Sequence, residues 1–288
     1  MIKGKPSYPF ETIALAVAFS PRLEALVAET KRLASLCSAK AIFIHPGKRT
    51  SEKERLLNSI LLNYGFNDSN CIVHWQDGTP VDVILEVCKA NVVDLLIIGV
   101  MEEENLLKYY MGSVSREISK RAKCSLLLLV DPKINPEPHW NIVVNGYDHA
   151  KTSHSINTAV YLATLQGAKE IDIVDETDIA SLAVSDIDEE ENSIAKNDFL
   201  REEKSKLFPF IQSLNRKDLD IKLKAVSGKT GNTIRQFAQS NKADLLVVNS
   251  PDHHLAIFDR IFSHDLEYML ADLPCDMLIV HSRVFDSL

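Results

Sequence analysis

Short apolar runs alternate with longer amphipathic stretches along the whole chain. Nearly continuous apolar runs of about four to eight residues are typical of strands buried on both faces of a parallel sheet. Between them, apolar residues with a helical period predict helices near residues 21–37, 51–64, 80–90 and 112–122. The predicted strands cover residues 12–19, 41–46, 71–76, 94–100 and 125–130, and then 142–147, 170–175, 221–226, 244–249 and 276–281.

The second half of the chain repeats the first. Residues 13–44 align without a gap at an offset of 129, and residues 78–117 align without a gap at an offset of 150. Ungapped identities over stretches of this length indicate two copies of one structural unit. The identical pairs include Ile13/Ile142, Leu33/Leu162, Lys40/Lys169, Gly78/Gly228, Asp94/Asp244 and Ser113/Ser263.

The two offsets differ by 150 − 129 = 21 residues, which indicates an insertion between the second and third strands of the second copy. This insertion, at about residues 176–195, contains the acidic stretch SDIDEEENS and predicts a solvated loop that leads into a helix. The proline-rich stretch DPKINPEPHW disfavours regular structure and predicts a linker at 133–140. We therefore expect one domain over residues 1–132 and a second over residues 141–288.

The alternation of strands and helices predicts an α/β protein with two doubly wound, five-stranded parallel sheets, one in each copy. Ligands of such sheets bind at the carboxyl ends of the strands. The strand ends are therefore the places to search for functional residues.

Composition and charge exclude several classes of function. The chain has 288 residues, 45% of them hydrophobic and 25% charged, as expected for a globular protein with two domains. A formal net charge of −8, without a large Lys/Arg cluster, argues against binding to nucleic acid or to anionic membranes. Neither a signal peptide nor an apolar segment of the ~20 residues that span a bilayer is found. Five cysteines without a CxxC pair indicate buried thiols in a reducing compartment, so we expect a cytoplasmic protein.

One stretch carries a recognisable motif. The fourth strand ends at Gly99, and after the spacer EENLLKYYM the chain continues as GSVS at the start of a helix. A strand followed by G-x2-G-x9-G-[S/T], a helix and a final strand such as PCDMLIV resembles the signature of the universal stress proteins. The resemblance extends over nearly the whole chain, twice, as in tandem universal stress proteins.

The resemblance implies the fold and the assembly of this family. The implied fold is the architecture described as adenine-nucleotide alpha-hydrolase-like or flavodoxin-like. In the family the fifth strands meet across a two-fold axis, which here implies an intramolecular pseudo-dimer. Whether two chains associate into a further homodimer stays open.

The resemblance also implies a nucleotide site in the first copy. In the family, the glycines let backbone N–H groups approach phosphate oxygens, and the following helix N-terminus adds donors and a positive dipole. The residues that match are Gly99, Gly112, Ser113, Val114 and Ser115. They are the nucleotide-binding or phosphate-binding residues that we expect, with ATP as the implied ligand and no certain cofactor.

Two departures from the motif predict that ATP binding in the first copy is weak. Glu102 stands where the second glycine is expected, and Glu103 and Glu104 follow it. Carboxylates beside a triphosphate repel it. The tip of the first strand is Ala18, where the family has an aspartate.

The second copy has lost most of the motif. At the offset of 150, Asn249, Asp252 and Phe262 replace the three glycines, and Ser263 alone remains. We therefore expect no ATP binding in the second copy. Asp148 follows its first strand, either as the counterpart of the family's aspartate or as a helix N-cap, and both interpretations stay open.

A histidine-rich segment of the second copy contains residue types that bind divalent metals. Adjacent histidines usually point in different directions, and the segment matches no fixed ligand spacing, so we expect no metal site. The residues of this segment that a metal would use are Asp252, His253, His254 and His264.

These features together predict a non-catalytic stress-response protein that acts as a ligand-sensing or protein-interaction module. No GxSxG, nucleophilic cysteine motif or HxxEH-type spacing supports catalysis. The alternatives are a weak ATPase, a metal-dependent phosphoester hydrolase at the histidine-rich segment, or a binder of an apolar small molecule.

Overall fold

The structure is a computed structural model that describes residues 8–103, 108–110, 112–147, 149–177, 207–227, 232–251, 266 and 268–281. Its contacts divide the chain into two compact units. The first unit is Met1–Pro138 together with Asp276–Leu288, and the second is His139–Cys275.

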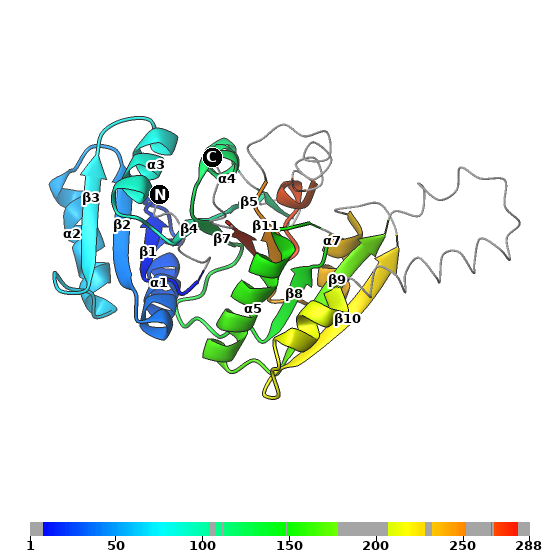
Figure 1. The fold of residues 1–288 in the computed structure, drawn as a ribbon. Coiled ribbons are helices and arrows are strands. Elements are labelled where there is room, and N and C mark those ends of the chain that lie inside the picture. Colours follow the sequence, from blue (N-terminus) through cyan, green and yellow to red (C-terminus); the bar gives the residue numbers. More distant parts are fainter. Residues whose placement is uncertain are drawn as a thin grey trace, which may run out of the picture. The chain divides into compact units, whose positions relative to one another are not determined.

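The first unit is built on a sheet in the order β12-β7-β4-β1-β2-β3, in which all pairs except β12 with β7 are parallel. Figure 1 shows β1, β2 and β3 side by side at one end of it. Buried aliphatic side chains on β1, β4 and β7 form the centre of its core. Its elements are β1 (Thr12–Ala16), α1 (Leu23–Cys37), β2 (Lys40–Pro46), α2 (Ser51–Asn63), β3 (Cys71–Gln76), α3 (Pro80–Ala90), β4 (Leu95–Gly99), β5 (Met101–Glu103), β6 (Lys108–Tyr110), α4 (Ser113–Arg121), β7 (Ser125–Leu129) and β12 (Asp276–Val280).

The second unit repeats this order with four parallel strands, β10-β9-β8-β11. Figure 1 shows β8, β9 and β10 side by side. The α/β class with two repeated, doubly wound domains is therefore confirmed. The elements of the second unit are β8 (Asn141–Asn145), α5 (Thr152–Gln166), β9 (Glu170–Thr177), β10 (Asp220–Ser227), α7 (Asn232–Ser240) and β11 (Leu245–Asn249).

The strand that ends the second copy in sequence belongs to the first unit in space. β12 pairs with β7 in the antiparallel direction, with Leu278 opposite Leu127. The carboxylate of Asp276 also accepts a hydrogen bond from the backbone N–H of Val130 at 2.8 Å. The last strands of the two copies therefore pair with each other, as the family resemblance implies.

The identical pair Asp94 and Asp244 has the same structural role in the two copies. Asp94 Oδ2 accepts hydrogen bonds from the backbone N–H groups of Glu11 and Thr12, at 2.8 and 2.9 Å. Asp244 Oδ2 accepts the equivalent bonds from Trp140 and Asn141, at 3.0 and 2.9 Å. Each aspartate thus satisfies the backbone donors at the start of the first strand of its copy, which explains why it occurs in both.

Two short strands that the sequence did not predict interrupt the motif of the first copy. β5 and β6 pair in the antiparallel direction, with Glu102 opposite Tyr109. The twelve residues between Gly99 and Gly112 therefore contain a pair of antiparallel strands.

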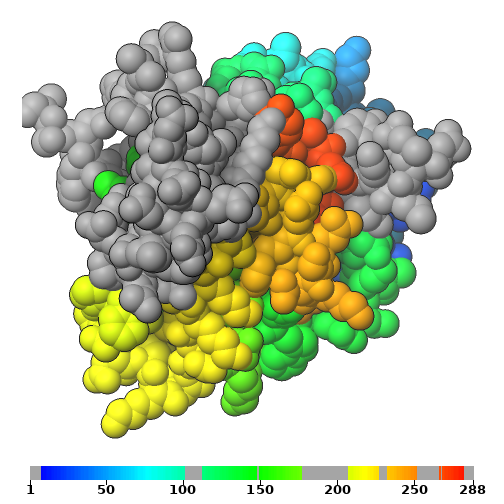
Figure 2. Space-filling view, turned by 90° about the vertical axis from the view of Figure 1, so that its right-hand side faces the viewer, coloured from blue at the N-terminus to red at the C-terminus, as the bar shows by residue number. Residues whose placement is uncertain are grey.

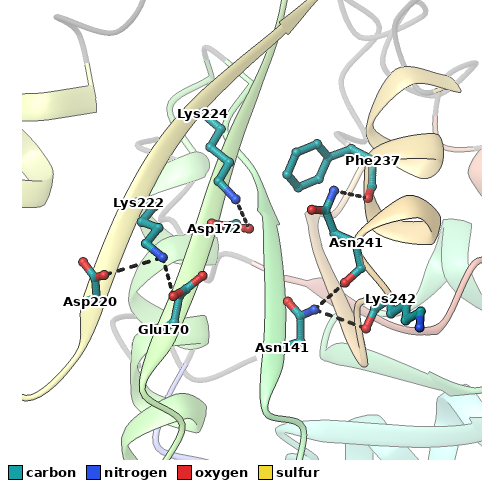
Figure 3. A network of polar contacts seen from close by, with 9 residues as sticks. All are labelled: Asn141, Glu170, Asp172, Asp220, Lys222, Lys224, Phe237, Asn241 and Lys242. Atoms are coloured by element: carbon teal, nitrogen blue, oxygen red, sulfur yellow. Dashed lines mark hydrogen bonds and ion pairs between the residues drawn. The ribbon is translucent and has the colours of Figure 1, made fainter.

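A ladder of charges links β9 and β10 on one face of the second unit (Figure 3). Lys224 Nζ donates to Asp172 Oδ2 at 2.6 Å, and Lys222 pairs with Glu170. The ammonium of Lys224 also lies 5.3 Å from the centre of the Phe237 ring on α7. Residues 207–227, in yellow, and α7, in orange, form neighbouring parts of the surface in Figure 2. Lysines on a strand at the edge of a sheet oppose pairing with another chain.

Candidate functional site

The sheet of the first unit has a topological switch point between the neighbouring strands β1 and β4. From β1 the chain runs outward through β2 and β3 on one side, and through β4 and β7 on the other. Ligands of doubly wound sheets bind at such points. The connection from β4 through α4 to the parallel strand β7 places the N-terminus of α4 at this same edge.

The start of α4 offers hydrogen-bond donors. Gly112 is the N-cap residue, and no side chain caps the helix. The first backbone N–H groups of a helix have no partner within the helix, and together with the dipole they favour an anion. Ser113 and Val114 are exposed, and Ser115 is half-buried. Within the described part of the chain, neither serine hydroxyl is engaged by a protein group. The predicted residues Gly112 to Ser115 therefore lie together at the carboxyl edge.

Gly99 has a packing role that its place in the motif does not reveal. A Cβ atom built on Gly99 would lie 3.0 Å from Leu26 Cδ1 on α1, which is closer than side-chain atoms normally approach. The missing side chain at Gly99 therefore lets α1 pack against the end of β4. This contact by itself accounts for the glycine, independently of any phosphate.

Arg22 is a functional candidate that the sequence did not reveal. It is the N-cap residue of α1 and half-buried. Its Nη1 donates to the carbonyl of Val100 at 2.6 Å, and its Nη2 donates to the carbonyl of Val130. These carbonyls directly follow β4 and β7, so the side chain extends from the end of β1 across the switch point.

Aromatic side chains cover the other side of the switch point. The rings of Phe19 and Trp75 are stacked with their centres 6.0 Å apart, and His45 meets Phe19 edge-on at 4.9 Å. His45 is buried, and its Nδ1 donates to the carbonyl of Val17 at 3.0 Å, since a carbonyl can only accept. Nε2 is then free to accept from Lys53 Nζ, at 3.4 Å. The carboxyl ends of β1, β2 and β3 are thus lined by packed rings.

The equivalent place in the second unit is filled by a buried polar network. Ser155 and Asn249, at the positions of Leu26 and Gly99, are hydrogen-bonded through Ser155 Oγ and Asn249 Oδ1, at 2.5 Å. Asn249 Nδ2 also donates to Thr152 Oγ1 at 3.0 Å. A leucine-to-glycine contact in one copy therefore corresponds to a serine-to-asparagine hydrogen bond in the other.

Lys151 occupies the position of Arg22 in the second unit. It is the N-cap residue of α5, and its Nζ donates to the carbonyl of Ser250 at 3.1 Å. Ser250 follows β11 as Val100 follows β4. Because α5 begins at Thr152, the interpretation of Asp148 as the N-cap of this helix is wrong, and Asp148 itself lies outside the described residues.

The other candidate site residues of the sequence lie in parts of the chain that the structure does not describe. Asp252, His253, His254 and His264 lie outside the described residues, as do Glu104 and Phe262. Within the described ranges, no three His, Cys, Asp or Glu side chains are grouped as metal ligands. None of the five cysteines forms a disulfide, and Cys88, Cys124 and Cys275 are buried. A hydrogen bond with Cys124 and burial raise the pKa of Cys88, which disfavours its reactive thiolate form.

Comparisons with known proteins agree with the fold and the motif. Residues 47–129 match the model of the universal stress protein family. None of the curated proteins compared with the chain matches it significantly.

Solved structures match the chain along nearly its whole length. A functionally unknown protein from Pseudomonas aeruginosa PAO1 has 14% sequence identity and a TM-score of 0.72, with 95% of this chain and 93% of that chain covered. A universal stress protein from Archaeoglobus fulgidus DSM 4304 has 12% identity and a TM-score of 0.65, with 96% and 97% covered. At these identities the similarity concerns the fold.

Proposed function

We propose that the chain is a non-catalytic member of the universal stress protein family, whose model matches residues 47–129. It acts as a ligand-sensing or protein-interaction module in a stress response. Its first unit binds ATP or phosphate weakly at Gly99 and at Gly112 to Ser115, and its second unit does not bind ATP.

The uncapped N-terminus of α4 at the switch point carries this proposal. It combines orphan backbone donors with the hydroxyls of Ser113 and Ser115, and these are the groups that an anion requires. Weak rather than tight binding follows from the acidic sequence of β5 and from the packing of Gly99 against Leu26. In the second unit, Asn249 stands at the position of Gly99, and its side chain is hydrogen-bonded to Ser155. The glycine that would admit a phosphate is therefore missing there.

The cysteines support the proposed cellular context. Five cysteines without a disulfide agree with a reducing compartment, and we place the protein in the cytoplasm. No helix of the described ranges is long and apolar enough to cross a bilayer. The pairing of β12 with β7 supports an intramolecular pseudo-dimer.

Calorimetric titration with ATP, with and without Mg²⁺, tests the proposal. We expect one site per chain with a Kd of about 0.1–1 mM, which corresponds to roughly −4 to −5.5 kcal/mol, and no release of phosphate over hours. Gly112→Phe is expected to abolish binding. Gly112 has φ −61° and ψ 165°, which any residue can adopt, so the change adds bulk without straining the backbone.

A matched pair of serine variants locates the site. Ser115→Ala should weaken ATP binding, because it removes a donor from the first turn of α4. Ser119→Ala on the same helix should not, because the Ser119 hydroxyl donates to the carbonyl of Arg116 instead. Absence of binding at ~5 mM ATP would refute a nucleotide site in the first unit, and steady phosphate release would show that the protein is an enzyme.

A further inference from the structure

We propose that Arg22 makes the first unit select ligands that carry negatively charged phosphate groups. This role rests on the proposed nucleotide or phosphate site. The guanidinium of Arg22 is a cation at the switch point, and it recognises the phosphate groups of the ligand. The start of α4 contributes donors to the same anion.

The position of Arg22 is fixed by the backbone at the edge where ligands bind. The guanidinium donates to the carbonyls of Val100 and Val130, directly after β4 and β7. A guanidinium carries five N–H donors in a rigid fork, so two bonds to carbonyls leave donors for a ligand. The fork matches phosphate oxygens in geometry as well as in charge.

The partners of Arg22 differ from those of the other arginines with described ion pairs. Arg22 binds two neutral carbonyls, and among the described residues no carboxylate forms an ion pair with it. A half-buried cation without a carboxylate partner attracts anions more strongly than an ion-paired arginine on the surface. The arginines that pair with a carboxylate are Arg32, Arg49, Arg121, Arg216 and Arg235.

The second unit keeps a cation at the position of Arg22. Lys151 stands at the equivalent position of the second unit and donates to the equivalent carbonyl, that of Ser250. The residues around these cations differ, since Leu26 and Gly99 in one copy correspond to Ser155 and Asn249 in the other. Both copies thus keep a cation over the end of the fourth strand while the packing beneath it changes.

Titration of variants with ATP and with adenosine tests this role. Arg22→Gln is expected to weaken ATP binding at least tenfold, because a hydrogen bond to a charged group is lost, and to change adenosine binding less than twofold. Arg22→Lys keeps the charge without the fork and should give an intermediate affinity for ATP. Lys151→Gln, the matched control in the second unit, should leave the ATP affinity unchanged.

The salt dependence of ATP binding gives a readout that a purely structural role would not change. ATP affinity of the unmodified protein should fall as KCl is raised, and the fall should be smaller in Arg22→Gln. Equal losses for ATP and adenosine, an unchanged ATP affinity, or tighter ATP binding in Arg22→Gln would each overturn the proposed role while leaving the site intact. Failure of the unmodified protein to bind ATP would instead refute the proposed function, and the role of Arg22 with it.

Discussion

His154 lies in the first turn of α5, one turn beyond Lys151. Burial lowers the pKa of its imidazole below the ordinary value of 6.5, and the positive charge of Lys151 lowers it further. The folded protein therefore binds a proton at His154 less readily than the unfolded chain does. The contribution of His154 to stability is fully present above pH 6.5 and is lost as the pH falls through its lowered pKa.

An NMR titration of the His154 ring measures this pKa directly. The midpoint should lie below 6.5 in the unmodified protein, and Lys151→Met should raise it partway, because the repulsion is removed and the burial remains. A midpoint at or above 6.5 in the unmodified protein would contradict this account. An unchanged midpoint in Lys151→Met would show that Lys151 does not act on the ring.

The contact between Gly99 and Leu26 predicts a coupling between two distant positions. Gly99→Ala should lower the free energy of unfolding by about 1 kcal/mol, because the new methyl group presses on Leu26. In a Leu26→Ala background the same change should cost much less, because the space is then empty. Urea unfolding of the two single variants and the double variant measures the coupling. Equal costs in both backgrounds would mean that Gly99 is required for a reason other than packing.

The charge ladder between β9 and β10 contains one pair with a buried member. The side chain of Asp172 is 6% exposed and that of Lys224 is 37% exposed. Asp172 Oδ1 is buried without a hydrogen-bond partner in the described part of the molecule. The carboxylate thus depends on Lys224, as Figure 3 shows. Removal of the lysine leaves a buried charge without compensation.

Two lysine variants on β10 separate the buried pair from the exposed one. Lys224→Met should lower the free energy of unfolding by about 2 kcal/mol, less than for a fully buried pair because Lys224 is partly exposed. Lys222→Met should cost less than about 1 kcal/mol, because its pair with Glu170 is exposed on both sides. Chemical denaturation measures both, and Asp172→Asn should restore stability to Lys224→Met. Similar losses for the two lysines would show that burial of Asp172 is unimportant.

Within the described ranges, the strands and helices could be predicted from the sequence, because burial against the sheet gives each element a regular pattern of apolar residues. The first-half helices begin and end within two residues of the predicted bounds. The β5–β6 hairpin was missed because three paired residues on each strand leave no periodic signal. Arg22 was missed because its partners Val100 and Val130 are 78 and 108 residues away, and a lone arginine after a strand resembles any helix start. Its alignment with Lys151 in the repeat was the available signal.

Strand β12 ends the second copy in sequence but belongs to the first unit in space. The stability of the first unit therefore depends on the end of the chain. Leu278 is fully buried and lies opposite Leu127 of β7. Leu278→Ala should lower stability by about 2–5 kcal/mol, as for a large-to-small change in a core. Because β12 groups with the first unit, part of this loss should fall on strands that precede it by some 150 residues in sequence.

Amide hydrogen exchange resolves where the loss occurs. In Leu278→Ala, exchange should accelerate on β7, at Leu126 to Leu128, and on its parallel neighbour β4. Leu246→Ala on β11 is the matched control, since Leu246 is equally buried and lies opposite Val143 of β8. Its effect should be concentrated on β8 and β11. If Leu278→Ala left β7 unchanged, β12 would be dispensable to the first unit, and the two copies would fold without sharing this strand.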